Sequence, residues 1–171
     1  SADPSAVTRD YVLRVDAPAD EAPVVSVFGG KITTYRRLAE HALEKLAPWF
    51  QDMRPAWTAA VPLPGGDMAD GNLARWEAQL AQRYPKLPRP LLAALGRRHG
   101  TLAVEVLGEV RSVDDLGTHF GADLYARELD YLVEREWARS AEDVLWRRTK
   151  AGLHLAPEQR EAVARYLARS L

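Results

Sequence analysis

Two consecutive glycines between a β-like run and an amphipathic stretch constrain this chain more than any other feature. The apolar run Val24–Phe28 is typical of a strand that is buried on both faces. Gly29 and Gly30 end that strand. From Tyr35 to Leu46 the apolar residues share one stripe, which predicts a helix that Pro48 ends. A helix that follows a buried strand usually packs back on the sheet, so we expect this one to do the same.

An earlier run, Tyr11–Val15, alternates in polarity and is rich in β-formers, which predicts another strand. Two prolines in the intervening segment 17–23 interrupt any hydrogen-bond ladder and indicate a loop. Residues 1–47 are therefore predicted to hold two strands and a helix.

The rest of the chain has a different character. Residues 48–71 are rich in proline and glycine, which indicates an irregular connection and a domain boundary. Residues 72–171 read as short amphipathic helices, the longest at about 122–138, and predict an all-helical domain. Ser112 and Asp115 have the spacing of a capping box. The expected fold class is thus mainly α: a helical bundle preceded by a strand–strand–helix unit.

Composition excludes several function classes. Lys plus Arg number 23 against 24 for Asp plus Glu, so the formal net charge of −1 does not favour nucleic acid or an anionic membrane. There is no cysteine, and the four histidines lie far apart without H-x-x-x-H spacing, so no metal site is expected. No apolar run is long enough to span a bilayer. The chain lacks an initiator Met, and we interpret it as a piece of a larger protein.

The double-glycine turn has features of a binding site for negative charge. Glycine lets a backbone approach a ligand closely, and the first amides of the following helix have no internal partners. These amides and the helix dipole favour negative charge, to which Lys31 adds a positive charge. A nucleotide P-loop is excluded, because Val25 stands where its first glycine belongs and Ile32 where Ser or Thr is needed. The pattern alone also fits a tight turn with a solvated lysine.

Longer motifs resemble those of FAD-dependent, quinone-linked (aerobic) glycerol-3-phosphate dehydrogenases. Thr8–Tyr11 reads T-R-D-Y, and Ser26–Arg36 reads S-V-F-G-G-K-I-T-T-Y-R, both similar to that family's pattern. Further similarity runs through Leu38–Leu46, Leu63–Gly66 and Trp146–Lys150. The resemblance covers nearly the whole chain and identifies it with the C-terminal portion of such an enzyme.

The resemblance implies specific roles for the turn. In this family the G-G-K turn lies against the flavin ring, so Gly29, Gly30, Lys31, Ile32 and Thr33 are expected to contact FAD. It also implies that Lys31 and Arg9 lie near the substrate, where the guanidinium suits the phosphate of glycerol 3-phosphate. In the parent enzyme, hydride would pass from C2 of this substrate to the flavin N5, giving dihydroxyacetone phosphate. Electrons would then pass to a membrane quinone.

The same resemblance implies what this chain lacks. The family's G-x-G-x-x-G motif for the FAD pyrophosphate is absent from it, and so is the expected catalytic histidine region. We therefore expect no catalytic residue here, no tight FAD binding and no turnover by the chain alone. The parent is expected to be cytoplasmic and to associate with the cytoplasmic face of the inner membrane.

Two alternatives remain open at this point. The helical part could be an interaction or regulatory module without a catalytic role, or the parent could be a glycerophosphate oxidase that passes electrons to oxygen. For residues 1–30 we expect disorder, a hairpin against the bundle, or pairing with another copy of the chain.

Overall fold

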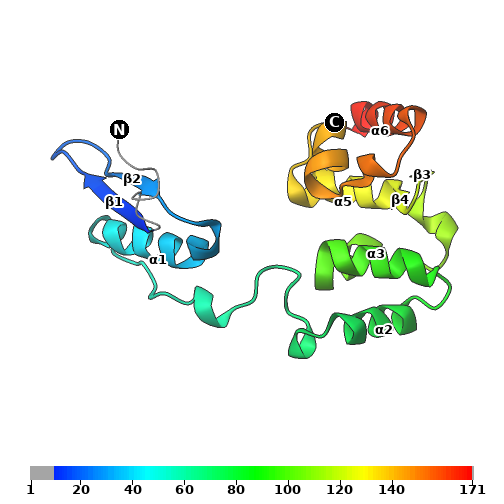
Figure 1. The fold of residues 1–171 in the computed structure, drawn as a ribbon, viewed down its shortest axis with the longest axis horizontal. Coiled ribbons are helices and arrows are strands. Elements are labelled where there is room, and N and C mark those ends of the chain that lie inside the picture. The colour runs from blue at the N-terminus through cyan, green and yellow to red at the C-terminus, as the bar shows by residue number, and fades with distance from the viewer. Residues whose placement is uncertain (1–9, 171) are drawn as a thin grey trace, which may run out of the picture. The chain divides into compact units, whose positions relative to one another are not determined.

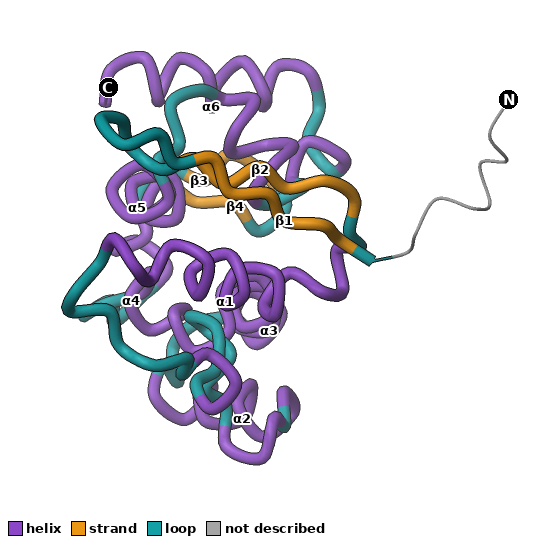
Figure 2. The backbone as a smooth tube through the Cα atoms, turned by 90° about the vertical axis from the view of Figure 1, so that its left-hand side faces the viewer, coloured by secondary structure: helices purple, strands orange, loops and turns teal. Residues whose placement is uncertain are grey.

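The protein forms two compact units, Ser1–Pro62 and Leu63–Leu171. A computed structural model describes residues 10–170 of the chain (Figure 1). The expectation of a mainly α fold is confirmed, since the described strands form only two small two-stranded sheets and helices dominate the rest (Figure 2). The division between the units falls inside the proline- and glycine-rich segment 48–71.

The N-terminal unit is a hairpin and one helix. Strand β1 (Tyr11–Asp16) pairs antiparallel with β2 (Val24–Gly29), with Tyr11 opposite Gly29 and Asp16 opposite Val24. Helix α1 (Tyr35–Leu46) contacts both strands. The described residues 10–30 thus contain a hairpin, which contacts α1 of its own unit.

The expectation that Val24–Phe28 is buried on both faces is wrong for this chain. Val24 is 58% exposed and Phe28 is 51% exposed. Burial on both faces needs a layer on each side of the sheet, whereas α1 is the only α-helix in the described part of this unit.

The helical unit carries the core. Apart from short 3₁₀ turns, its described elements are α2 (Leu73–Arg83), α3 (Arg89–His99), α4 (Ala103–Leu107), β3 (His119–Gly121), β4 (Leu124–Tyr125), α5 (Ala126–Glu136), a π-helix (Asp143–Arg148) and α6 (Pro157–Ser170). Buried leucines from these helices form one apolar cluster, including Leu80, Leu92, Leu107, Leu129, Leu132 and Leu167. The apolar stripes predicted from 3.6-residue periodicity supply these side chains.

One close approach of two backbones fixes the start of this unit. The Gly65 carbonyl lies so near Gly100 that a Cβ at Gly100 has no room, and it accepts a hydrogen bond from the Thr101 amide at 3.0 Å. The indole of Trp76 donates to the Gly100 carbonyl at 2.9 Å, which ties α2 to the end of α3. These glycines are required because the segments meet without space for side chains.

The capping residues behave as the sequence indicates. The Ser112–Asp115 capping box is present and starts a short 3₁₀ helix, Val113–Leu116. Ser140 and Asp143 form a second pair with the same spacing, and the Ser140 hydroxyl donates a hydrogen bond to the Asp143 carboxylate. The pKa of Asp143 is lowered to about 2, first because its carboxylate accepts the Arg139 amide, and further by the Ser140 hydroxyl.

The helix expected at about 122–138 is shorter than predicted. Residues 119–125 instead form the β3–β4 hairpin, and α5 begins only at Ala126. Ala122 adopts a left-handed φ of 48° at the turn of this hairpin. Phe120 and Leu124 are buried on its two strands, so packing of the hairpin prevails over the helical pattern. With 14 residues, α6 is longer than α5, which has 11.

A buried charge cluster joins α3 to α5. Glu128 is 2% exposed and accepts two hydrogen bonds from Arg98, at 2.8 and 2.9 Å. His99 Nε2 lies 2.7 Å from the same carboxylate, and Arg98 also donates to Asp123 at 3.0 Å. Arg98 and His99, at the end of α3, therefore contact carboxylates inside the helical unit, and each buried charge there has a partner.

Candidate functional site

The turn after β2 requires glycine at both positions. Gly29 has a φ of 76° and Gly30 a φ of 98°, which are left-handed values that side chains disfavour. A Cβ at Gly29 would lie 3.1 Å from the Asp10 carbonyl oxygen, and one at Gly30 would lie 3.4 Å from Tyr11 and Leu38. The chain therefore turns sharply away from β2 while lying directly against β1 and α1.

The turn leaves backbone donors free. Lys31 is extended, with φ −109° and ψ 149°, and Ile32–Thr34 form one 3₁₀ turn before α1. Thr34 donates its amide and its hydroxyl back to the Lys31 carbonyl, at 3.0 and 2.8 Å. Within residues 10–170, the amides of Ile32 and Thr33 form no backbone hydrogen bond and receive no side-chain cap. They are the unpaired donors expected at a helix start.

The structure brings five of the six sequence-predicted site residues together. Gly29, Gly30, Lys31, Ile32 and Thr33 are consecutive and exposed, and Ile32 is 89% exposed. The Lys31 ammonium makes no ion pair with any residue of the described range. Arg9 lies outside the described residues. The name Gly-Gly corner is used below for Gly29–Thr33.

Two contacts hold α1 in place beside the corner. The ring of His41 meets that of Tyr11 edge-on at 5.8 Å, which ties α1 to β1. On α1, Glu40 accepts hydrogen bonds from Thr58 and from Arg36, the latter at 3.0 Å. The Thr58 hydroxyl is the main reason that the pKa of Glu40 is lowered, and the Arg36 charge contributes. The connecting segment is thereby attached to the helix that starts at the corner.

This arrangement is suited to binding a negative or electron-rich group. Free amides at a helix start and a nearby ammonium both attract such a group. Gly29–Thr33 are exposed, so a planar ligand can reach this part of the backbone. The part of the chain that the structure describes contains no group of three or more His, Cys, Asp or Glu that could hold a metal ion.

Sequence reasoning missed the charge cluster around Glu128. The signal was present, because Glu128 is four residues before the buried Leu132 and therefore lies on the apolar face of α5. Its partner Arg98 is 30 residues away, and no local pattern joins the two.

Among the described residues, no helix is long and apolar enough to cross a membrane.

Known proteins with similar sequences cover this chain almost completely. It is 52% identical to glycerol-3-phosphate dehydrogenase of Pseudomonas aeruginosa over 98% of its length, and 48% identical to aerobic glycerol-3-phosphate dehydrogenase of Escherichia coli over 96%. It is 45% identical to D-erythritol 1-phosphate dehydrogenase of Brucella abortus over 93%. Each match covers 32% of the relative, so the chain spans about a third of the length of these proteins.

A family match identifies the larger part of the chain. Residues 56–171 match the family described as the C-terminal domain of alpha-glycerophosphate oxidase. This range contains the whole helical unit, whereas the Gly-Gly corner precedes it. The resemblance inferred from the sequence motifs is confirmed: the chain belongs to the glycerophosphate oxidase and dehydrogenase family and corresponds to its C-terminal portion.

Proposed function

We propose that this chain is the C-terminal part of an FAD-dependent enzyme that oxidises glycerol 3-phosphate to dihydroxyacetone phosphate and passes electrons to a quinone. The names of the relatives support the substrate. In this proposal residues 1–47 belong to the flavin and substrate domain, residues 48–71 connect, and residues 72–171 form the helical domain. The observation that carries the proposal is the exposed Gly-Gly corner with its free amides and unpaired lysine.

The residues of the corner fit a flavin edge. FAD, when bound, accepts the electrons taken from the substrate alcohol. The amides of Ile32 and Thr33 donate toward an electron-rich ring edge, and preorganised donors of this kind stabilise charge as it develops. Lys31 and Arg9 bind the substrate, and the guanidinium holds the phosphate through two parallel hydrogen bonds. The missing pyrophosphate-binding motif and catalytic histidine come from the remainder of the parent.

The proposal is tested in the full-length parent with Lys31→Ala. We expect bound flavin to fall or the KM for glycerol 3-phosphate to rise about tenfold, since a charge-assisted contact is worth roughly 1.5–3 kcal/mol. Lys45→Ala is the matched control, because Lys45 lies in the last turn of α1, at the end of that helix away from the corner. A Lys31 variant with normal flavin content and normal KM would remove this residue from the site.

The relatives leave a second substrate to be tested. One of them, at 45% identity, is named for D-erythritol 1-phosphate, which is also a polyol phosphate. Comparing kcat/KM for the two substrates in the parent decides between them.

Measuring turnover of the parent with a quinone and with oxygen as the electron acceptor distinguishes the dehydrogenase from the oxidase. Deleting residues 72–171 tests the helical domain, which is accessory if flavin content and quinone reduction persist.

Association of the parent with the cytoplasmic face of the inner membrane belongs to the same proposal. It rests on the need to deliver electrons to a membrane quinone. A sedimentation assay of the parent with quinone-containing vesicles measures it, and a parent that stays in the supernatant contradicts it.

A further inference from the structure

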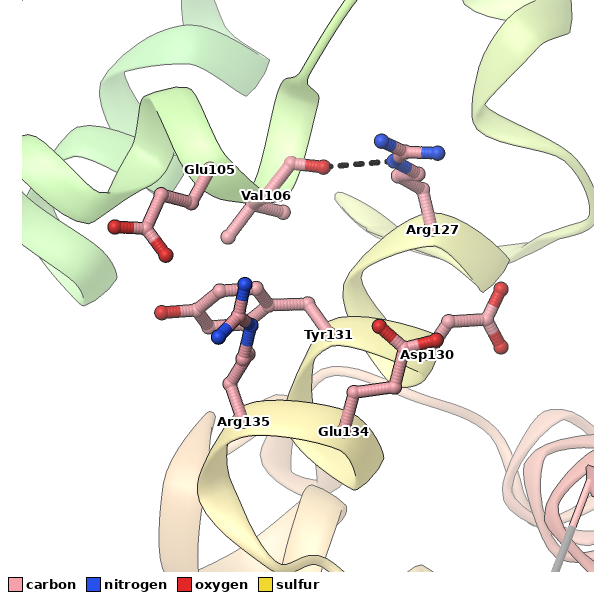
Figure 3. A pocket seen from close by; sticks show the side chains of 7 residues that line it. All are labelled: Glu105, Val106, Arg127, Asp130, Tyr131, Glu134 and Arg135. Carbon is pink, nitrogen blue, oxygen red and sulfur yellow. Dashed lines mark hydrogen bonds between the residues drawn. The ribbon is translucent and has the colours of Figure 1, made fainter.

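A hollow opens between α4 and one face of α5 in the helical unit (Figure 3). Its volume is about 560 Å³, which is within the range of small-molecule sites. Glu105 comes from α4, and α5 supplies residues at helical spacing. The polar side chains from α5 are those of Arg127, Asp130, Tyr131, Glu134 and Arg135.

Tyr131 places a hydroxyl without a hydrogen-bond partner in this hollow. The residue is only 8% exposed, and its ring packs edge-on against His99 at 5.5 Å. Burial raises the pKa of its hydroxyl, and the negative charge of Glu105 adds to this effect, so the group keeps its proton at neutral pH. No residue of the described range accepts a hydrogen bond from it or donates one to it. Because no buried side-chain polar atom of the described residues lacks a partner, this hydroxyl is open to the hollow, where a bound polar group can reach it.

Charged groups of both signs line the hollow. Glu105, Glu134 and Arg135 make no ion pair with other residues in the described range. Two further side chains are held in position: the Arg127 Nε donates to the Val106 carbonyl at 2.9 Å, and Asp130 accepts from the Tyr166 hydroxyl at 2.9 Å.

The mixture of charges selects the class of ligand. A simple cation would meet two guanidinium groups, and a simple anion would meet three carboxylates. A molecule with one charge of each sign can place its ammonium by the carboxylates and its anion by the guanidinium groups. We propose that this hollow is a binding site for a small zwitterion that carries an amine and a carboxylate, with the Tyr131 hydroxyl as an additional hydrogen-bonding group.

Titration of the full 171-residue chain with γ-aminobutyrate, followed by NMR, tests the site. We expect saturable shifts of amide signals in α4 and along residues 127–135. Butylamine and butyrate, which each carry one of the two charges, should bind at least about tenfold more weakly, because each lacks one set of charge-assisted hydrogen bonds.

Three variants make the test specific. Tyr131→Phe removes only the hydroxyl, and Glu105→Gln removes one charge from α4; each should weaken binding several-fold. Glu142→Gln changes an exposed carboxylate outside the hollow and should leave binding unchanged. The proposal is overturned if γ-aminobutyrate gives no saturable shifts, if butylamine or butyrate binds as tightly, or if both site variants bind like the unchanged protein.

Discussion

The two units of this protein differ in what they bury. The apolar core of the helical unit runs from Leu80 to Leu167, and its largest side chains are fully buried. In the N-terminal unit no residue of the described range is buried. Of the fifteen large hydrophobic side chains that are exposed in the described chain, twelve lie between Val12 and Val61.

The contrast shows which unit buries its own apolar surface. Contiguous exposed apolar surface marks a contact with another part of a protein or a partner. The helical unit buries most of its large apolar side chains, as an independent domain does, and exposes only Leu63, Trp137 and Leu153 in its described part. The hairpin and α1 have regular backbones but exposed faces, and this agrees with the proposal that the rest of the parent covers them and completes the flavin site at the Gly-Gly corner.

The largest expected effect comes from the charge cluster that joins α3 and α5. Glu128→Gln leaves Arg98 and His99 without their shared carboxylate, in an environment where Arg98 is only 16% exposed. We expect the free energy of unfolding of the helical unit to fall by about 3–5 kcal/mol, as measured by urea denaturation.

Glu77→Gln is the matched control. It breaks an ion pair with Arg97, which is 67% exposed, and should change the free energy of unfolding by no more than about 1 kcal/mol. A loss of no more than about 1 kcal/mol for Glu128→Gln as well would show that the Glu128 cluster does not stabilise the unit.

Paired apolar truncations sharpen the comparison between the units. Leu129 is fully buried, so Leu129→Ala should lower the free energy of unfolding of the helical unit by about 2–5 kcal/mol. Phe28 is 51% exposed, so Phe28→Ala should change that free energy by less than about 0.5 kcal/mol. A large loss on truncation of Phe28, measured by the same urea denaturation, would mean that the hairpin shares the core of the bundle.

The smallest effect concerns the Asp143 cap. Its pKa is about 2 in the folded protein against an ordinary value of 3.8, so its contribution to stability is complete above the ordinary value and is lost as the pH falls toward 2. Asp143→Asn should therefore lower Tm at neutral pH, and the difference from the unchanged protein should shrink between about pH 4 and pH 2.

Thermal unfolding scans across that pH range measure the difference. Asp114→Asn is the control, because Asp114 is an exposed neighbour of the other capping box. A Tm difference for Asp143→Asn that stays constant down to pH 2 contradicts the assignment of the cap.

Local chemistry made part of this structure predictable. The turn at Gly29 and Gly30 was predictable because glycine readily adopts left-handed φ values, and the end of α1 was predictable from Pro48. The capping box at Ser112 was predictable for the same reason, because its partners are three residues apart.

Features that depend on distant partners were not predictable. The β3–β4 hairpin was missed because its short strands are stabilised by packing of Phe120 and Leu124, and α6 contacts β3. The exposure of β2 could not be read from its apolar sequence, since burial depends on which layers are present. In the candidate site, the turn itself was predictable, whereas the attachment of Glu40 to Thr58 joins residues 18 positions apart and has no sequence signal.

Amide hydrogen exchange on the full chain tests the central claim most directly. If the N-terminal unit depends on absent parts of the parent, amides of β1, β2 and α1 should exchange within minutes, while those around Leu129 and Leu132 are protected up to the free energy of global unfolding. Protection in α1 and the hairpin that matches protection in α5 would contradict the account, because it would show that the unit with the Gly-Gly corner is stable by itself.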